Sequence, residues 1–202
     1  MSKYALVGNL IQKCIYNNNY KNILSIGTYN FPLATEKMER FSMKNSIKFS
    51  NKYFDLVYCY DIFNDIRDYD YEIVCKEINR FSKEGIIETF SPLKIITLTK
   101  RDSEFVKWKI NKNHITWTDY HTNTLCFMIL DKKYDSENIF MNITNNIKNN
   151  SQIFYHNFYM WDLNNPINIK IYNYKNEEEY IKIFKEASYK SICNTELLMN
   201  FY

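Results

Sequence analysis

The residues best placed for chemistry follow two apolar runs, at 23–26 and 53–60. Gly27 ends the first run, and Asp61, with Asn64 three residues on, follows the second. If both runs are parallel strands, these residues lie at the carboxyl edge of the sheet, where α/β sheets bind ligands. A glycine there lets the backbone approach a ligand, and carboxylate or amide groups bind its polar atoms. A plain turn at the glycine and a solvated loop after the second run explain the same residues, so both interpretations stay open.

The histidines and cysteines lack the spacing of metal or nucleophilic sites. His114, His121 and His156 have no second ligand at helical or hairpin spacing, which favours exposed or hydrogen-bonded imidazoles over a metal centre. No Ser-His-Asp, Cys-His or paired-carboxylate signature is recognisable. The five cysteines include no C-x-x-C pair, and several lie in apolar runs. We therefore expect reduced, buried thiols in a reducing compartment.

The composition is that of an ordinary globular chain, with 202 residues of which 46% are hydrophobic and 24% charged. Because 26 basic residues stand against 23 acidic ones, the net charge of +3 gives no reason to expect nucleic acid or an anionic membrane as partner. No signal peptide and no apolar stretch of about 20 residues is recognisable, which predicts a cytoplasmic protein. Abundant Asn, Lys and Ile beside 3 glycines indicate an AT-rich genome, for example that of a giant DNA virus.

Three buried strands and one helix must position the candidate residues. Apolar runs at 23–27, 53–60 and 85–89 predict the strands. Between the last two runs, apolar residues recur at i, i+4 and i+7 from Val74, which predicts a helix that Gly85 stops. A strand, a helix and a strand in this order form a parallel pair with a right-handed crossover. We expect the three strands to be parallel neighbours, with the helix packed on one face.

The second half of the chain is predicted to consist mainly of short antiparallel strands. Apolar runs at 105–110, 115–117 and 125–130 are closely spaced, and apolar residues alternate with polar ones over 167–171. A last helix follows an acidic start at 177–179.

These elements predict an α/β fold in two parts that share one core. The first part is an α/β domain over 1–130, which opens with an amphipathic helix over 4–20. The second is a β-rich extension over 131–202 that ends in the C-terminal helix.

Several stretches resemble one enzyme family. The sequence from Ile23 to Tyr29, Ile-Leu-Ser-Ile-Gly-Thr-Tyr, sits where that family has a strand followed by a Gly-x-Gly turn. Residues 54–59 resemble its fourth strand, 76–93 its next helix and fifth strand, and 158–162 a late strand. The family is the class I S-adenosylmethionine-dependent methyltransferases, in particular a small type 11-like subgroup found beside sugar-modifying genes. The resemblance implies a reduced Rossmann-like methyltransferase sheet with helices on its faces and an antiparallel β extension.

The resemblance implies S-adenosylmethionine as cofactor and places its binding positions on five residues: Ser25, Gly27, Tyr29, Asp61 and Asn64. The family has an acid where this chain has the serine, and a second glycine where it has the tyrosine, whose ring would lie in the ligand's place. The nearest substitute acids are Glu36 and Glu39. Between the first two strands there is room for at most one of the family's strands two and three, because each crossover needs about a dozen residues.

Two functions follow from these departures. The first is a methyltransferase-like protein that has lost S-adenosylmethionine binding and acts as a binding or assembly module, either as a homo-oligomer or with a protein partner. The alternative is an active S-adenosylmethionine-dependent methyltransferase acting on a sugar hydroxyl. In the first case the aromatic residues Phe158, Tyr159 and Trp161 are expected at the interface. The same cluster could instead pack in the core or stack on a sugar or base.

Overall fold

The computed structural model describes residues 20–28, 31–65, 71–90, 114–131 and 156–200, together with residues 12 and 134. For Asn64, Asp65, His156 and residues 192–200 it describes the backbone alone. Three predictions lie outside these ranges: the helix over 4–20, apart from two residues, the strand over 105–110, and the position of Tyr29.

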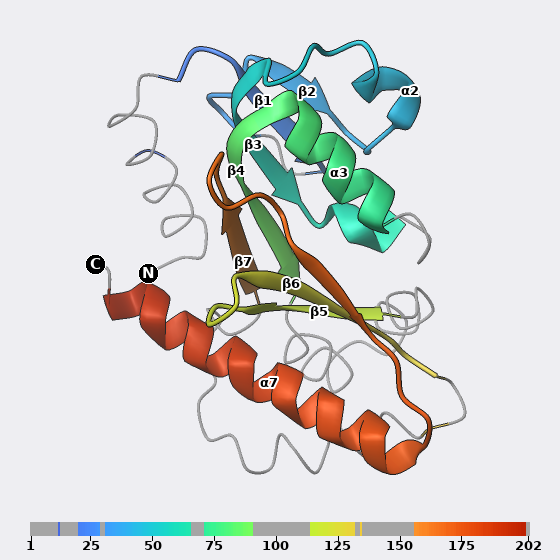
Figure 1. The fold of residues 1–202 in the computed structure, drawn as a ribbon. Coiled ribbons are helices and arrows are strands. Elements are labelled where there is room, and N and C mark those ends of the chain that lie inside the picture. Colours follow the sequence, from blue (N-terminus) through green and yellow to red (C-terminus); the bar gives the residue numbers. More distant parts are fainter. Residues whose placement is uncertain are drawn as a thin grey trace.

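Five strands form the larger sheet (Figure 1). In chain order they are β1 (Ile23–Gly27), β2 (Glu36–Met38), β3 (Phe54–Tyr60), β4 (Ser82–Phe90) and β7 (His156–Trp161). Their order across the sheet is β2-β1-β3-β4-β7. The first four strands are parallel, and β7 is antiparallel to β4. The prediction that the strands near residues 23, 55 and 86 are parallel neighbours is therefore confirmed.

Helix α3 (Tyr71–Phe81) joins β3 to β4 and packs on one face of this sheet. Its residues Val74 and Ile78 are buried in the same cluster as Leu24 and Val57 of the strands. Apolar residues at i, i+4 and i+7 line the face toward the sheet, which is the pattern of an amphipathic helix. The helix predicted from this spacing is therefore confirmed.

Gly85 does not stop the helix, as the sequence had suggested, but lies inside β4. A β-carbon on Gly85 would come closer than 3.0 Å to the ring of Trp161 and to the backbone carbonyl oxygen of Val57. The glycine therefore permits close packing between β4 and its neighbouring strands. The helix ends at Phe81, and β4 begins directly after it.

Two short helical segments complete this half of the chain. Helix α2 (Met43–Ser46) lies between β2 and β3, and the 3-10 helix η1 (Ile62–Asp65) follows β3. Both lie on the same side of the larger sheet as α3 in the view of Figure 1.

A second sheet has the order β5-β6-β8, with β5 (His114–Asp119), β6 (Thr124–Ile129) and β8 (Ile169–Tyr172). The first two strands pair antiparallel, as predicted for this half of the chain. The strand predicted near 167–171 is present as β8, but it pairs parallel with β6. The chain passes through β7 of the other sheet before it reaches β8, so no hairpin turn forces β8 to be antiparallel.

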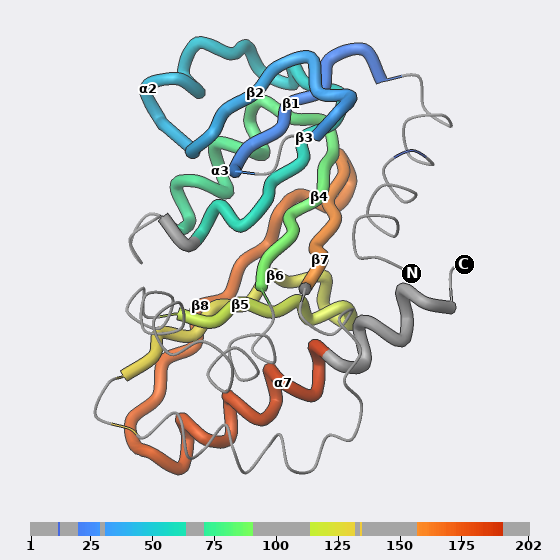
Figure 2. Tube along the Cα trace, turned by 180° about the vertical axis from the view of Figure 1, so that it is seen from behind, coloured from blue at the N-terminus to red at the C-terminus, as the bar shows by residue number. Residues whose placement is uncertain are grey.

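Helix α7 (Glu177–Asn200) covers the second sheet. Tyr180, Phe184 and Ala187 are buried in one cluster with Ile115 and Trp117 of β5. Figure 2 shows this helix at the opposite end of the molecule from α2. Neither α7 nor any other helix in the described ranges is long and apolar enough to span a membrane.

The two sheets share a core. Leu125 and Phe127 of β6 lie in the same buried cluster as Tyr159 of β7 and Cys59 of β3. Both sheets also take strands from each side of residue 130, since β7 completes the larger sheet and β8 completes the smaller one. The structure is thus an α/β fold whose sheets mix parallel and antiparallel strands.

Candidate functional site

The strand order identifies one candidate ligand-binding position at the carboxyl edge of the larger sheet. From β1 the chain passes to β2 on one side, and it then returns to β3 on the other side of β1. Connections leave a crevice at such a reversal point, and ligands of open α/β sheets bind there. The edge between the ends of β1 and β3 is therefore the candidate site.

Gly27 lies at the end of β1 in a conformation that favours glycine, with φ 111°. A β-carbon at this residue would come closer than 3.0 Å to the backbone carbonyl oxygen of Tyr60, its partner in β3. The fold itself therefore requires the glycine, because two strands approach each other closely at this point.

Ser25 is buried on the face of the sheet that points away from α3. Its hydroxyl oxygen accepts a hydrogen bond, 3.4 Å long, from the backbone N–H of Phe31. The ring of Phe31 packs 5.7 Å from the ring of Tyr58, the β3 residue directly beside Ser25. This hydrogen bond holds the segment after β1 against the sheet.

The crossover from β1 to β2 consists of eight residues, 28–35, and its described residues, 28 and 31–35, contain no helix. A turn at Pro32 and Leu33 is followed by Thr35, whose hydroxyl group and backbone N–H both bond the backbone of Ile23. The prediction that one strand at most fits between β1 and β3 is confirmed by β2, although the crossover is shorter than a dozen residues. Residues 31–35 therefore offer no helix N-terminus to an anionic or polar ligand.

Asp61 follows β3 directly and has φ 54°. Its backbone N–H donates a hydrogen bond, 2.8 Å long, to the carbonyl oxygen of Glu88 at the end of β4. Asn64 lies three residues further on in η1. The structure thus brings Gly27, Asp61 and the backbone of Asn64 to one edge, while Ser25 lies two residues inside the sheet.

A buried carboxylate that sequence reasoning missed lies beside this edge. Glu88 of β4 is 1% exposed, and the hydroxyl group of Tyr58 donates a hydrogen bond to its Oε2 atom. Glu88 pairs with Tyr60 in the register of β3 and β4, so it lies level with the end of β3. The signal in the sequence was a single acid within the apolar run Ile-Ile-Glu-Thr-Phe. A charged group in such a run needs a hydrogen-bond partner.

Of the two substitute acids, only Glu39 lies at the ligand-binding end. Glu36 begins β2, where it pairs with Leu24. Met38 ends β2 opposite Ile26, so Glu39 follows at the level of the end of β1. Its side chain is exposed.

The described residues contain no group of three or more metal-ligating side chains. Burial raises the pKa of the Cys75 thiol to about 12 and that of Cys126 to about 11, and it raises the pKa of Cys59 as well. These thiols are therefore protonated at neutral pH and are poor nucleophiles. His114 is buried against Tyr71, with the ring centroids 5.4 Å apart.

The aromatic residues expected at an interface lie inside the chain's own core. Phe158, Tyr159 and Trp161 are 5%, 0% and 4% exposed, and they belong to two buried clusters formed by the chain's own residues. On this strand the exposed apolar side chain is Met160, at 43%. The prediction of an interface at the three rings is therefore wrong.

Comparison with protein-family models, curated proteins and solved structures finds no match for this chain.

Proposed function

We propose that this chain is a methyltransferase-like protein that does not bind S-adenosylmethionine and acts as a module for binding another protein. The family resemblance is supported by the order of the strands. The segments that resemble the family's first, fourth and fifth strands are the parallel neighbours β1, β3 and β4, and α3 lies between the last two. The segment that resembles a late strand is β7, beside β4.

The observation that carries the loss of cofactor binding is the crossover 28–35. In nucleotide-binding α/β folds, the glycine turn after the first strand leads into a helix whose N-terminal N–H groups face the ligand. Here the chain runs from β1 to β2 without a helix in residues 31–35, and Phe31 is buried against Tyr58. The position that a β-carbon of Gly27 would occupy is blocked by the backbone of Tyr60, so strand packing alone accounts for the glycine. Contacts within the chain thus stand where a cofactor-binding helix would begin in those folds.

The alternative, an active methyltransferase on a sugar hydroxyl, is favoured by Glu39. A carboxylate at the end of the second strand is in the right place to accept hydrogen bonds from ribose hydroxyls. Glu39 follows β2 at the level of the end of β1, and its exposed side chain is accessible to a ligand.

Calorimetric titration of the full chain with S-adenosylmethionine, and with its demethylated product, separates the two functions. We expect no binding heat from either compound. A dissociation constant in the low micromolar range, about −8 kcal/mol, would overturn the proposal.

If such binding is found, Glu39→Gln tests the alternative, with Glu36→Gln at the far end of the same strand as its control. A loss of about tenfold or more in affinity for Glu39→Gln alone, worth about 1.4 kcal/mol, would assign the ribose contact to Glu39.

A further inference from the structure

Residues 36–53, which comprise β2 and the connection through α2 to β3, are rich in basic residues. This stretch holds five basic and two acidic residues. These residues therefore have a local excess of positive charge. A local excess of one sign attracts partners of the opposite sign.

Apolar side chains are exposed beside these cations. Ile47 is 70% exposed and Met43 is 39% exposed. The backbone N–H of Ile47 donates to the carbonyl oxygen of Met43, so the two residues are one helical turn apart and share a face. Lys44 and Lys48 follow them at the same spacing, are exposed, and form no ion pair with any residue that the structure describes. We call these four residues the α2 surface.

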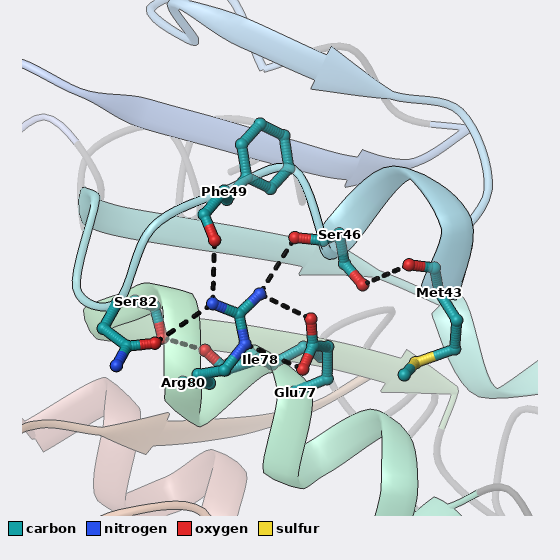
Figure 3. Close-up of polar contacts among 8 residues, drawn as sticks. Met43, Ser46, Phe49, Glu77, Ile78, Arg80 and Ser82 are labelled. Carbon is teal, nitrogen blue, oxygen red and sulfur yellow. Dashed lines mark hydrogen bonds and ion pairs between the residues drawn. The ribbon is translucent and has the colours of Figure 1, made fainter.

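Arg80 of α3 anchors the backbone that carries the α2 surface (Figure 3). The guanidinium group donates to both carboxylate oxygens of Glu77, to the backbone carbonyl oxygens of Ser46 and Phe49, and to the side chain of Asn51. All five of its N–H donors are therefore used within the chain. Lys52 adds hydrogen bonds to two carbonyl oxygens near the end of α3.

This anchoring means that the connection does not have to become ordered when a partner binds. A preorganised surface avoids the entropic cost of fixing a loop, which otherwise reduces the affinity. The exposed Ile47 can fill a pocket or groove of a partner as an apolar anchor, while the two lysines contact acidic groups at the rim.

We infer that the α2 surface docks an acidic, amphipathic segment of a partner protein. The inference rests on the proposed function as a binding module and names the surface and the partner's chemistry. A membrane fits less well, because interfacial helices bury a long apolar face and α2 has only four residues. A single-stranded nucleic acid fits less well, because Met43 and Ile47 offer no aromatic ring for a base to stack on.

Selection from a displayed library of random peptides, with the full chain as bait, tests the inference. We expect the selected peptides to be enriched in Asp and Glu and to carry Leu or Phe at helical spacing. Labelled copies of these peptides should bind more weakly to Ile47→Asp by about tenfold or more, because the anchor is lost. The double variant Lys44→Glu/Lys48→Glu should lose a similar factor, and the residual binding should no longer weaken with salt.

Matched controls lie on α7, at the other end of the molecule (Figure 2). Tyr189 is 60% exposed, and Lys182 and Lys185 are exposed cations at neighbouring helical positions. Tyr189→Asp and Lys182→Glu/Lys185→Glu should change the peptide affinity by less than about twofold, since surface changes away from an interface have small effects.

Three results would overturn the inference. They are a selection that yields no peptide, selected peptides without an acidic excess, and equal affinity for the wild-type chain and Ile47→Asp. Binding to phosphatidylserine vesicles that Ile47→Asp abolishes would replace the protein partner by a membrane. The titration with S-adenosylmethionine uses no peptide, so failure at the α2 surface and failure of the proposed function are told apart.

Discussion

The backbone carbonyl oxygen of Tyr60 lies closer than 3.0 Å to the point where a β-carbon on Gly27 would be. The two residues end β1 and β3 and are partners in the parallel register. The glycine that resembles part of a cofactor-binding turn therefore has a sufficient reason in the packing of the sheet. Its backbone also has φ 111°, a conformation that residues other than glycine rarely adopt.

Gly27→Ala should destabilise the fold by about 2–4 kcal/mol, because the methyl group meets backbone atoms and the residue keeps a positive φ. Urea denaturation of both proteins measures the difference. Thr28→Ala, at the exposed next position, is the control and should change the free energy of unfolding by less than about 0.5 kcal/mol. A cost below about 1 kcal/mol for Gly27→Ala would mean that the strand ends can move apart.

Asn79 joins the two halves of the chain through one amide group. Its Nδ2 donates to the carbonyl oxygen of Ile167, and its Oδ1 accepts from the N–H of the same residue. Asn79→Asp removes the donor and should reduce the free energy of unfolding by about 1–3 kcal/mol. Thermal unfolding followed by circular dichroism measures this, with the exposed Asn45→Asp as control. Equal transition temperatures for the two variants would contradict the prediction.

The strands and the helix near the candidate site could be predicted because their signals are local. The apolar runs at β1, β3 and β4 are buried on both faces, and the spacing from Val74 repeats the helical turn. These patterns depend on neighbours a few residues away in the chain.

The features that sequence reasoning missed depend on distant residues. Gly85 looked like a helix stop, but its role comes from Trp161, which follows 76 residues later in the chain and pairs with it across β4 and β7. Likewise, Glu88 is accommodated in an apolar strand because Tyr58, on the neighbouring strand, donates a hydrogen bond to it. Neither partner is marked by a pattern in the sequence.

Asp55 makes stability depend on pH. Burial opposes its ionisation, but hydrogen bonds from Lys83 and from the backbone N–H groups of Asn22 and Lys21 outweigh this, so its pKa lies below 3.8 in the folded chain. A depressed carboxyl pKa contributes stability above the unfolded value of 3.8 and loses it as the pH falls through the folded value. The contribution is modest, because Lys83 is 46% exposed.

Asp55→Asn should therefore be less stable than the wild-type chain at neutral pH, and the difference should shrink below pH 3.8. Urea denaturation over a pH series measures both proteins. Glu72→Gln, in a carboxylate that is 63% exposed, is the control and should follow the wild-type curve. A difference that grows toward acid pH would show that the sign is wrong.

Arg80→Lys tests the anchoring of the connection through α2. A lysine ammonium has one donor centre and cannot replace the fork that reaches Glu77, Ser46 and Phe49 at once (Figure 3). We expect a loss of about 1–3 kcal/mol in the free energy of unfolding and faster tryptic cleavage at Lys44 and Lys48. Lys76→Arg on the same helix is the control for a change between the two cations. Unchanged cleavage in Arg80→Lys would mean that other contacts hold the connection.

Trp161→Ala measures how much an aromatic side chain of β7 contributes to the core. Trp161 is 4% exposed, its Nε1 donates to the hydroxyl oxygen of Ser82 over 3.1 Å, and its ring lies against Gly85. Removing this ring leaves a cavity, so we expect a loss of about 3–5 kcal/mol in the free energy of unfolding. Met160→Ala, at the exposed neighbour in the same strand, should cost less than about 1 kcal/mol. Urea denaturation of both variants measures the two losses, and equal losses for Trp161→Ala and Met160→Ala would contradict the role of the tryptophan ring in the core.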